Sequence, residues 1–347
     1  MTSEDLIYID KDISVAKTMP SLFYTDNDYY DKTLKKIFNY SWQFVNDKKT
    51  IDKYKIIPFS FLSDSINEPL ILTNNKNIEC FSNVCTHRAN ILCSYPSNKK
   101  TIQCGYHGRT FDLCGKFKFM PGFEDAKNFP SETDNLKKAN IKRWNKFIFC
   151  SLNLGIDIDN VLDDINNRLK NFPFDELIFD NKKSSEYIIN AHWATYCENY
   201  LEGFHVPYVH NGLNNDIDID TYETIILKNG VLQQTKSKNL NNKIYAYYYW
   251  FFPNMMFNFY DWGLSINIIE PMGINKTKIK FLSYPKNGYH QEEGKDSSID
   301  KVEAEDQSIV TQVNKGLKSQ YYKHGRYSPK YEKGIHYFHQ LLAKYIK

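Results

Sequence analysis

The chain has 347 residues, with 44 Lys and Arg against 41 Asp and Glu, and 16% of its residues are aromatic. This length exceeds what one hydrophobic core usually takes, so two domains are expected. A net charge of +3 is close to balance. It argues against a nucleic-acid partner and against binding to an anionic membrane surface.

The N-terminus and the cysteines predict the compartment. Residues Met1 to Asp5 lack the basic start and apolar run of a secretory signal peptide. No apolar stretch of the chain approaches the roughly 18 residues that span a bilayer. The seven cysteines are odd in number and scattered, which disfavours a disulfide framework and favours a reducing compartment. We therefore expect a cytoplasmic protein that does not associate with membranes.

The first half of the chain changes pattern twice. Apolar residues at helical spacing predict a helix over residues 28–45. Short apolar runs broken by Asn, Ser, Gly and Asp then predict a small all-β module between about 50 and 150. Its clearest strands are expected over residues 54–61, 69–73 and 146–152.

The second half mixes helices with long aromatic strands. Helices are expected over 159–172 and 190–205, then a polar loop over 286–298, and further helices over 299–318 and 331–346. Between them, strands that would pair antiparallel are expected over 222–238, 243–252, 255–260, 264–269 and 277–284.

These patterns predict an α+β protein in three parts. Residues 1–45 would form an N-terminal helical segment packed on the C-terminal domain. Residues 46–155 would form the all-β domain. Residues 156–347 would form an α+β domain with a large antiparallel sheet flanked by helices.

Two short stretches of the β module, Cys85-Thr86-His87 and Cys104-Gly105-Tyr106-His107, can hold a metal. The thiolates could bind one iron of a [2Fe-2S] cluster and the imidazoles the other. Structural zinc and chance are the alternatives. Each stretch gives one Cys and one His, which is less usual for zinc. Gly105 and Gly108 let two loop tips approach closely, with backbone N–H groups near the sulfides. A cluster, and hence one-electron chemistry, is favoured.

His205 and His210 suggest a second metal. On an ideal helix, residues five apart point about 140° from one another. They converge only if the helix ends or bends, and Pro207 between them supplies a break. Neutral imidazoles with one carboxylate and open positions suit a non-haem Fe(II) that must bind O₂. Two ordinary core or surface histidines are the alternative.

A carboxylate for this second site is expected on the helix over 299–318. That helix carries an apolar stripe, and Asp306 falls at its centre, with Glu303 and Glu305 to the sides. A carboxylate on a buried face is costly unless it is paired or bound to a cation. A metal would explain Asp306, and a buried salt bridge is the alternative.

The two motifs together resemble the catalytic alpha subunits of the Rieske non-haem iron oxygenases, and among them the choline, glycine betaine and carnitine monooxygenase group. The segment Asn199-x-x-Glu202-x-x-His205-x₄-His210 is similar to the mononuclear iron signature of that family. The resemblance implies a [2Fe-2S] cluster on Cys85, His87, Cys104 and His107, and a mononuclear iron that uses O₂ on His205, His210 and Asp306.

Further positions gain an expected role from the resemblance. Glu202 stands where the family has a carboxylate that bridges a cluster His of one chain and an iron His of its neighbour, and Asn199 belongs to the same motif. Asn90 and Tyr106 stand where respiratory Rieske proteins have a disulfide-bonded cysteine pair. The resemblance also implies a head-to-tail homotrimer and electrons from a separate NAD(P)H-dependent reductase, with or without a ferredoxin.

The aromatic segment 245–262 is expected to contribute to a substrate pocket, since alternate strand residues share a face. Aromatic faces attract cationic methylammonium groups. We therefore expect monooxygenation or demethylation of a small quaternary ammonium compound. An aromatic-ring hydroxylating dioxygenase alpha subunit is one alternative, and a Rieske electron-transfer protein with an inactive second site is another. The sequence names neither the substrate nor the reductase.

Overall fold

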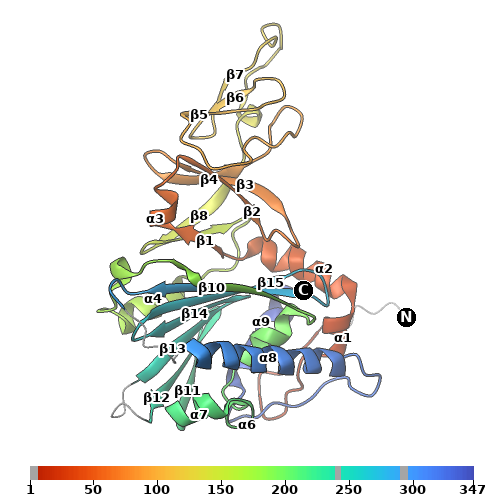
Figure 1. Cartoon of the computed structure of the whole chain (residues 1–347). Coiled ribbons are helices and arrows are strands. Elements are labelled where there is room, and N and C mark those ends of the chain that lie inside the picture. Colours follow the sequence, from red (N-terminus) through yellow and green to blue (C-terminus); the bar gives the residue numbers. More distant parts are fainter. Residues whose placement is uncertain (1–6, 239–243, 290–295) are drawn as a thin grey trace. The chain divides into compact units, whose positions relative to one another are not determined.

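The computed structural model describes residues 7–238, 244–289 and 296–347 (Figure 1). The chain forms two compact units, one from Asn39–Gly155 and the other from the residues before Asn39 together with Ile156–Lys347. Two expectations concern residues outside this description. One is that the start of the chain lacks a signal peptide, and the other is most of the loop expected over 286–298. The part of that loop from Asp296 onward is already helical.

The predicted helix over 28–45 is wrong in its second half. Two helices, α1 (Ser21–Thr25) and α2 (Asn27–Lys36), are followed by a 3₁₀ turn, η1 (Phe38–Tyr40), and by strand β1 (Gln43–Asp47). β1 pairs antiparallel with β9 (Phe147–Ser151), because its aromatic and β-branched residues favour an extended chain. The boundary between the units therefore lies at residues 38 and 39, and not at 45 and 46 as predicted.

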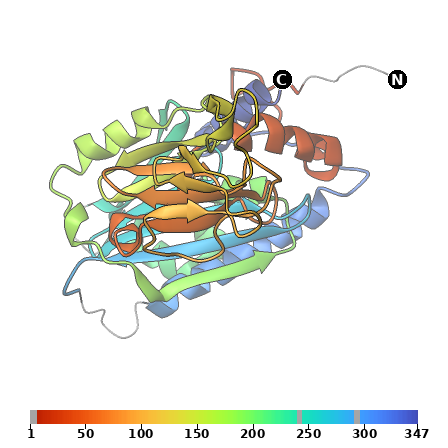
Figure 2. The same ribbon diagram turned by 90° about the horizontal axis from the view of Figure 1, so that it is seen from above.

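The unit of residues 39–155 is the predicted all-β module. Its larger sheet is antiparallel, in the order β1-β9-β8-β4-β3-β2, and its smaller one has the order β5-β6-β7. Figure 2 shows these strands in orange and yellow. The other elements are β2 (Ile56–Phe61), β3 (Glu68–Asn74), β4 (Ile78–Ser82), β5 (Thr101–Gln103), β6 (Thr110–Asp112), β7 (Phe117–Phe119), β8 (Lys138–Trp144), α3 (Lys48–Ile51) and η2 (Glu132–Asp134).

The other unit is built on a seven-stranded antiparallel sheet in the order β10-β16-β15-β14-β13-β12-β11, which confirms the predicted α+β class. Its strands are β10 (Asp180–Ile189), β11 (Ile217–Leu227), β12 (Gly230–Ser237), β13 (Ile244–Phe251), β14 (Met255–Tyr260), β15 (Gly263–Pro271) and β16 (Thr277–Pro285). The remaining elements are α4 (Asp159–Arg168), η3 (Phe174–Glu176), α5 (Trp193–Tyr200), α6 (Val206–Val209), α7 (Asn211–Asp216), α8 (Asp296–Gly316) and α9 (Lys333–Tyr345).

Two features of this sheet differ from the prediction. The strand expected over 222–238 is a hairpin of β11 and β12, because Asn229 takes a left-handed φ of 55° and Gly230 follows it. Strand β10 was not expected at all. Its first seven residues, Asp180 to Glu186, are polar and partly or fully exposed, as suits the edge of a sheet, and carry no apolar alternation to reveal a strand.

The two faces of the sheet have different neighbours. On one face, Phe259 packs edge-on against Phe172, and the Tyr249 hydroxyl donates to Asp164 of α4. On the other face, the Trp250 ring lies 5.1 Å from the ring of Phe338 in α9. Figure 1 shows the long helix α8 running across the sheet. Because successive strand residues point to opposite faces, one strand supplies both core and cavity.

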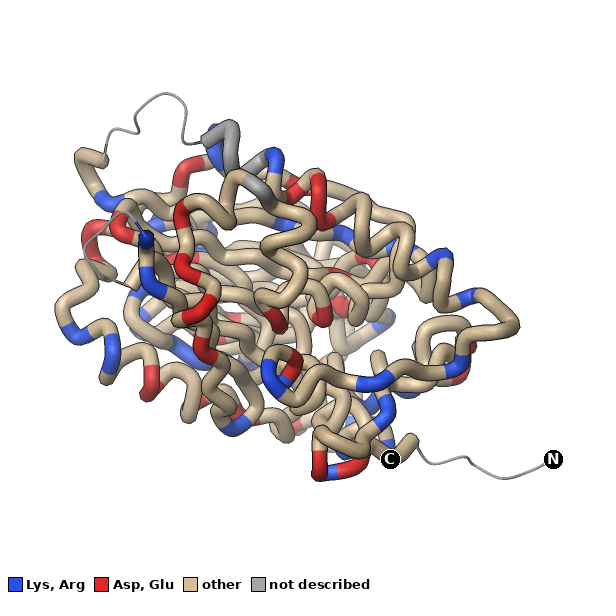
Figure 3. Tube along the Cα trace, turned by 90° about the horizontal axis from the view of Figure 1, so that it is seen from below, with Lys and Arg blue, Asp and Glu red and all other residues tan. Residues whose placement is uncertain are grey.

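In the view from below, basic and acidic positions are interspersed along the tube (Figure 3). Within the described part of the chain, none of the helices is both long and apolar enough to cross a membrane.

Phe338→Ala should destabilise the unit that contains the seven-stranded sheet. Its side chain is fully buried and contacts the rings of Trp193, Trp250 and Phe252. Removing a buried phenylalanine ring leaves a cavity and costs about 3–5 kcal/mol of unfolding free energy. Differential scanning calorimetry should show a lower transition temperature for that unit. Tyr321→Ala, at a side chain that is 94% exposed, is the control. A wild-type transition in Phe338→Ala would contradict the packing described.

Candidate functional site

Two loops of the β unit have the same backbone conformation. In each, the cysteine N–H donates to the carbonyl five residues later, and the cysteine carbonyl accepts from the N–H four residues later. These bonds measure 2.8 and 3.0 Å at Cys85, and 2.7 and 3.1 Å at Cys104. The residue four positions after each cysteine has a left-handed φ, 51° at Ala89 and 75° at Gly108. The sequence therefore forms two matched turns, each presenting one thiol and one imidazole.

The four residues expected to hold a cluster come together at these loops. The rings of His87 and His107 are 4.9 Å apart, and Cys85 and Cys104 are buried free thiols that interact with each other. The Nδ1 atom of His107 is buried and has no hydrogen-bond partner among the described residues. Burial and the neighbouring His107 lower the pKa of His87. Two imidazoles, one with an orphaned ring nitrogen, beside two thiols fit a [2Fe-2S] ligand set.

The two thiols differ in acidity. Burial raises the pKa of Cys85. At Cys104 burial also opposes ionisation, but the amides of Tyr106 and His107 and the side chain of Asn90 donate to the sulfur and hold its pKa below the usual value. Tyr106 N and Asn90 Nδ2 each lie 3.5 Å from Cys104 Sγ. Asn90 and Tyr106, which stand where respiratory Rieske proteins have a disulfide, thus both donate to the sulfur of Cys104.

A buried ion pair that the sequence did not reveal fixes the loops. Arg109 is 2% exposed, and its Nη2 atom donates to Asp134 Oδ1 at 2.6 Å. The guanidinium lies 5.0 Å from the centre of the Phe117 ring, and Thr86 donates to the Asp134 carbonyl at 2.8 Å. The buried charge of Arg109 is tolerated because it is paired with the Asp134 carboxylate. Both loops are therefore tied to one carboxylate-bearing turn.

The second pair of histidines flanks a short helix. α5 ends at Tyr200, His205 is the N-cap of α6, and His210 follows α6. Pro207 lies in the first turn of α6, where a missing N–H leaves no bond unmade. The helix break expected at Pro207 therefore occurs earlier, between α5 and α6. The result is nevertheless the expected one, since the rings of His205 and His210 lie 5.0 Å apart.

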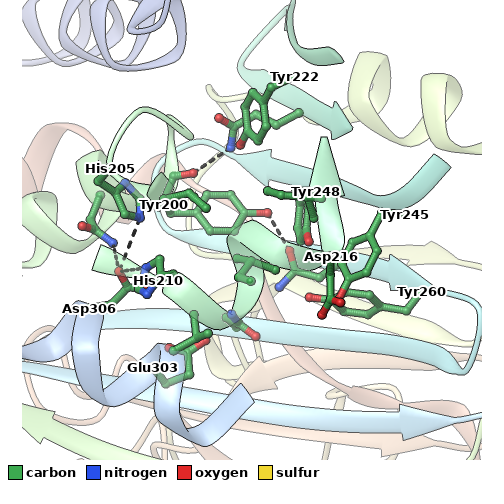
Figure 4. A pocket seen from close by; sticks show the side chains of 18 of the residues that line it. Tyr200, His205, His210, Asp216, Tyr222, Tyr245, Tyr248, Tyr260, Glu303 and Asp306 are labelled. Carbon is green, nitrogen blue, oxygen red and sulfur yellow. Dashed lines mark hydrogen bonds and ion pairs between the residues drawn. The ribbon is translucent and has the colours of Figure 1, made fainter. Parts of the chain in front are cut away.

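Asp306 of α8 faces both histidines (Figure 4). Its Oδ1 atom lies 2.9 Å from His210 Nε2 and 3.5 Å from His205 Nε2. One donor atom from each of the three residues lies within 4.8 Å of the others. Asn199 Nδ2 donates to the same Asp306 oxygen at 2.7 Å. Two imidazoles and one carboxylate that face one point are a donor set suited to non-haem Fe(II).

Carboxylates hold the far side of both imidazoles. Glu202 Oε1 lies 2.5 Å from His205 Nδ1, and Glu305 Oε2 lies 2.8 Å from His210 Nδ1. Because each Nδ1 is occupied, each Nε2 is left to face the metal position. Burial opposes protonation of His210, yet Asp306 and Glu305 raise its pKa. The contact of Glu305 was not foreseen, although it adjoins Asp306 in sequence.

A cavity of about 510 Å³ opens beside His205, His210 and Asp306. Of the aromatic segment expected to line a pocket, only part does so, while Trp250, Phe251 and Phe257 are core. Sequence reasoning did not place Glu303, one helical turn before Asp306, in the cavity, and it missed Tyr196 and Tyr200 of α5. The aromatic lining residues are Tyr196, Tyr200, Tyr222, Tyr245, Tyr248, Tyr260, Trp262 and Tyr289.

Comparison with known proteins identifies the family. Residues 41–130 match the Rieske [2Fe-2S] domain, and residues 224–347 match the catalytic domain of the ring hydroxylating alpha subunit. The chloroplastic choline monooxygenase of Arabidopsis thaliana is 30% identical over 359 residues, which cover 96% of this chain and 83% of that protein. The chain belongs to the Rieske non-haem iron oxygenases. It is a catalytic alpha subunit related to the choline and carnitine monooxygenases.

Further relatives of this Rieske oxygenase agree. The carnitine monooxygenase oxygenase subunit of Escherichia coli K12 is 27% identical, with 96% of this chain and 94% of that one covered. Among solved structures, the quaternary ammonium Rieske monooxygenase CntA with L-carnitine has a TM-score of 0.79 at 23% identity, covering 96% of each chain. Naphthalene 1,2-dioxygenase has a TM-score of 0.73 at 15% identity, covering 99% of this chain and 94% of that one. These likenesses show a common fold.

The family confirms several predictions. The Rieske [2Fe-2S] domain and the non-haem iron domain are both present, so structural zinc and a bare electron carrier are set aside. The cytoplasmic location stays a prediction, since the plant relatives are chloroplastic by name.

Asn90→Leu should lower the reduction potential of the Rieske centre. Asn90 donates to Cys104 Sγ, and a hydrogen bond to a ligand sulfur stabilises the more negative, reduced cluster. The potential can be measured by a redox titration followed in the visible spectrum. Asn75→Leu, at an exposed position of the same unit, is the control and should keep the wild-type value. An unchanged potential in Asn90→Leu would exclude this role for the amide.

Proposed function

We propose that this Rieske oxygenase oxidises a small quaternary ammonium compound, by monooxygenation or N-demethylation, with O₂ and with electrons from a separate NAD(P)H-dependent reductase. The cavity carries the proposal, because its many tyrosine rings adjoin three converging metal-binding side chains. Aromatic faces attract methylammonium groups. Relatives named for choline and carnitine, similar over 96% of the chain, support the same substrate class.

We also assign the ligands of the two metal centres. The described geometry supports a cluster on Cys85, His87, Cys104 and His107, and an iron on His205, His210 and Asp306. When bound, the cluster supplies single electrons and the iron supplies O₂ activation. The protein residues prepare this chemistry. Glu202 and Glu305 fix which nitrogen of each imidazole faces inward, and Asn199 orients the Asp306 carboxylate.

Electron transfer between chains of a head-to-tail homotrimer is part of the proposal. Glu202, already bonded to His205, is 11% exposed, and the nearby Tyr208 ring is 79% exposed. On the β unit, Tyr106 beside His107 is 59% exposed. Exposed apolar groups around both centres suit an interface. Inter-subunit electron transfer is described for a quaternary ammonium monooxygenase of this fold that oxidises carnitine.

His205→Ala should abolish turnover and leave the visible spectrum of the cluster unchanged. The variant removes one nitrogen from the iron site and touches none of the residues assigned to the cluster. Iron analysis should fall from about three to about two atoms per chain. Loss of the cluster spectrum together with turnover would contradict the assignment of two separate centres.

The same variant tests the route between chains by complementation. His205→Ala chains and Cys104→Ser chains are each inactive alone, but a mixed trimer can pair an intact cluster with an intact iron site. Random mixing in a closed ring should restore about one quarter of wild-type turnover. Light scattering should show that both variants form trimers. If mixed, fully exchanged trimers stay inactive, electrons do not cross between chains.

Single-turnover experiments test the substrate class. The protein is reduced anaerobically, freed of reductant, and mixed with O₂ and one candidate compound, while cluster reoxidation is followed in the visible spectrum. Choline, betaines or carnitine-like compounds should accelerate reoxidation and yield product, because the cavity is suited to their methylammonium group. Acceleration by aromatic compounds alone would favour a ring-hydroxylating oxygenase instead.

A further inference from the structure

The cavity has two ends. Figure 4 shows His205, His210 and Asp306 on one side of Tyr200, and a group of tyrosines on the other side. The Tyr200 ring lies between them, and its hydroxyl donates to Asn258 Oδ1 at 2.6 Å. A substrate that reaches the iron position from the tyrosine end must therefore extend past Tyr200.

Two rings at the far end form the walls of a corner. The rings of Tyr248 and Tyr260 are 5.9 Å apart and nearly perpendicular, at 82°. Strand register explains this arrangement. Tyr248 of β13 is paired with Asn258 of β14, so Tyr260, two residues later, is its diagonal neighbour on the same face. Trp262 stacks on Tyr260 at 5.3 Å and 10°, which holds the second wall in place.

A third ring and a carboxylate complete the corner. Tyr245 and Asp216, at the end of α7, line the same part of the cavity (Figure 4). Burial, together with the charge of Asp216, raises the pKa of Tyr245, so the carboxylate lies close to that ring. Burial also holds the pKa of Tyr248 well above its usual value. These rings therefore stay neutral at physiological pH and keep electron-rich faces.

The charges around the cavity have one sign. Histidines aside, the charged side chains among the described lining residues are carboxylates: Glu202, Asp216, Asp261, Glu303 and Asp306. A quaternary ammonium group has no N–H to donate, so it is recognised by ring faces and by opposite charge rather than by hydrogen bonds. Perpendicular tyrosines with a carboxylate beside them provide both.

We propose that Tyr245, Tyr248 and Tyr260, together with Asp216, form the subsite for the cationic head of the substrate, on the side of Tyr200 away from His205, His210 and Asp306. This inference rests on the proposed function and makes it more specific. The methyl groups are held at the tyrosines, and the oxidised carbon lies on the arm that extends past Tyr200. There, one C–H bond becomes C–OH, the second oxygen atom of O₂ leaves as water, and two protons and two electrons from the reductase balance the reaction.

Binding of tetramethylammonium to the holoenzyme, measured by calorimetry, tests the subsite without any need for turnover. Tyr248→Leu should weaken this binding at least about tenfold, whereas Tyr248→Phe, which keeps the ring, should stay within about twofold of the wild type. Asp216→Asn should weaken it by a factor that shrinks as salt is added. Tyr321→Leu, at a highly exposed position outside the cavity lining, is the control and should bind tetramethylammonium as the wild type does.

Two further measurements place the subsite. His205→Ala should bind tetramethylammonium as the wild type does, because the subsite lies across Tyr200. Choline should bind at least about tenfold more tightly than 3,3-dimethylbutan-1-ol, which has the same shape without the charge. If the melting transition shows that Tyr248→Leu does not fold, Tyr260→Leu takes its place. This variant removes the other ring of the corner and should also weaken tetramethylammonium binding.

The products separate this inference from the proposed function. Oxidation on the arm releases no formaldehyde, whereas oxidation of a methyl group does. The subsite would be overturned if the ring variants and Asp216→Asn bound tetramethylammonium with wild-type affinity. It would also be overturned if oxidation of a quaternary ammonium substrate released formaldehyde. Either result would leave the proposed substrate class intact. If tetramethylammonium binds with the expected variant pattern but no quaternary ammonium compound is oxidised, the subsite stands and the proposed function fails.

Discussion

The proposed iron site depends on one carboxylate oxygen, Asp306 Oδ1. It receives the Asn199 amide at 2.7 Å and faces the inner nitrogens of His205 and His210. A carboxylate in this half-buried position must be compensated by donors or by a cation. The same oxygen therefore joins α8 to the α5–α6 segment, about a hundred residues earlier in the chain, and sets the point that the three proposed iron ligands face. The cavity between these helices and the sheet follows from that junction.

Both proposed metal centres use the same physical device, in which the expected ligand groups are held by partners that do not themselves face the metal position. In the β unit the buried Arg109–Asp134 pair and Thr86 tie down the two matched loops. In the larger unit Glu202 and Glu305 occupy the outer nitrogens of the histidines. Such preorganisation lowers the cost of arranging ligands when a metal binds, and it sets which atoms are offered.

The antiparallel sheet lets one aromatic sequence serve two purposes. Strand β13 reads Ile244-Tyr-Ala-Tyr-Tyr-Tyr-Trp-Phe, and its alternation sends Tyr249 toward Asp164 of α4 while Tyr248 faces the cavity. Neighbouring Tyr260 meets Tyr248 only because of the register between β13 and β14. A slip of one residue would exchange the core face and the cavity face of the strand. The proposed subsite thus depends on strand register as much as on composition.

The sequence by itself determined the features that depend on close spacing: the paired Cys and His of each loop, the His205–His210 pair around Pro207, and Asp306 on an apolar stripe. Local spacing fixes which residue types can converge; the resemblance of the resulting motifs to a known family predicted the family, and the apolar patterns along the chain predicted the α+β class. Only the tertiary structure decided that β1 joins the β unit, that β10 is an edge strand, and that Glu305 and Arg109 hold the two centres. Those outcomes depend on partners far away in the chain, or on an ion pair within an apolar module, and neither leaves a periodic signal in the chain.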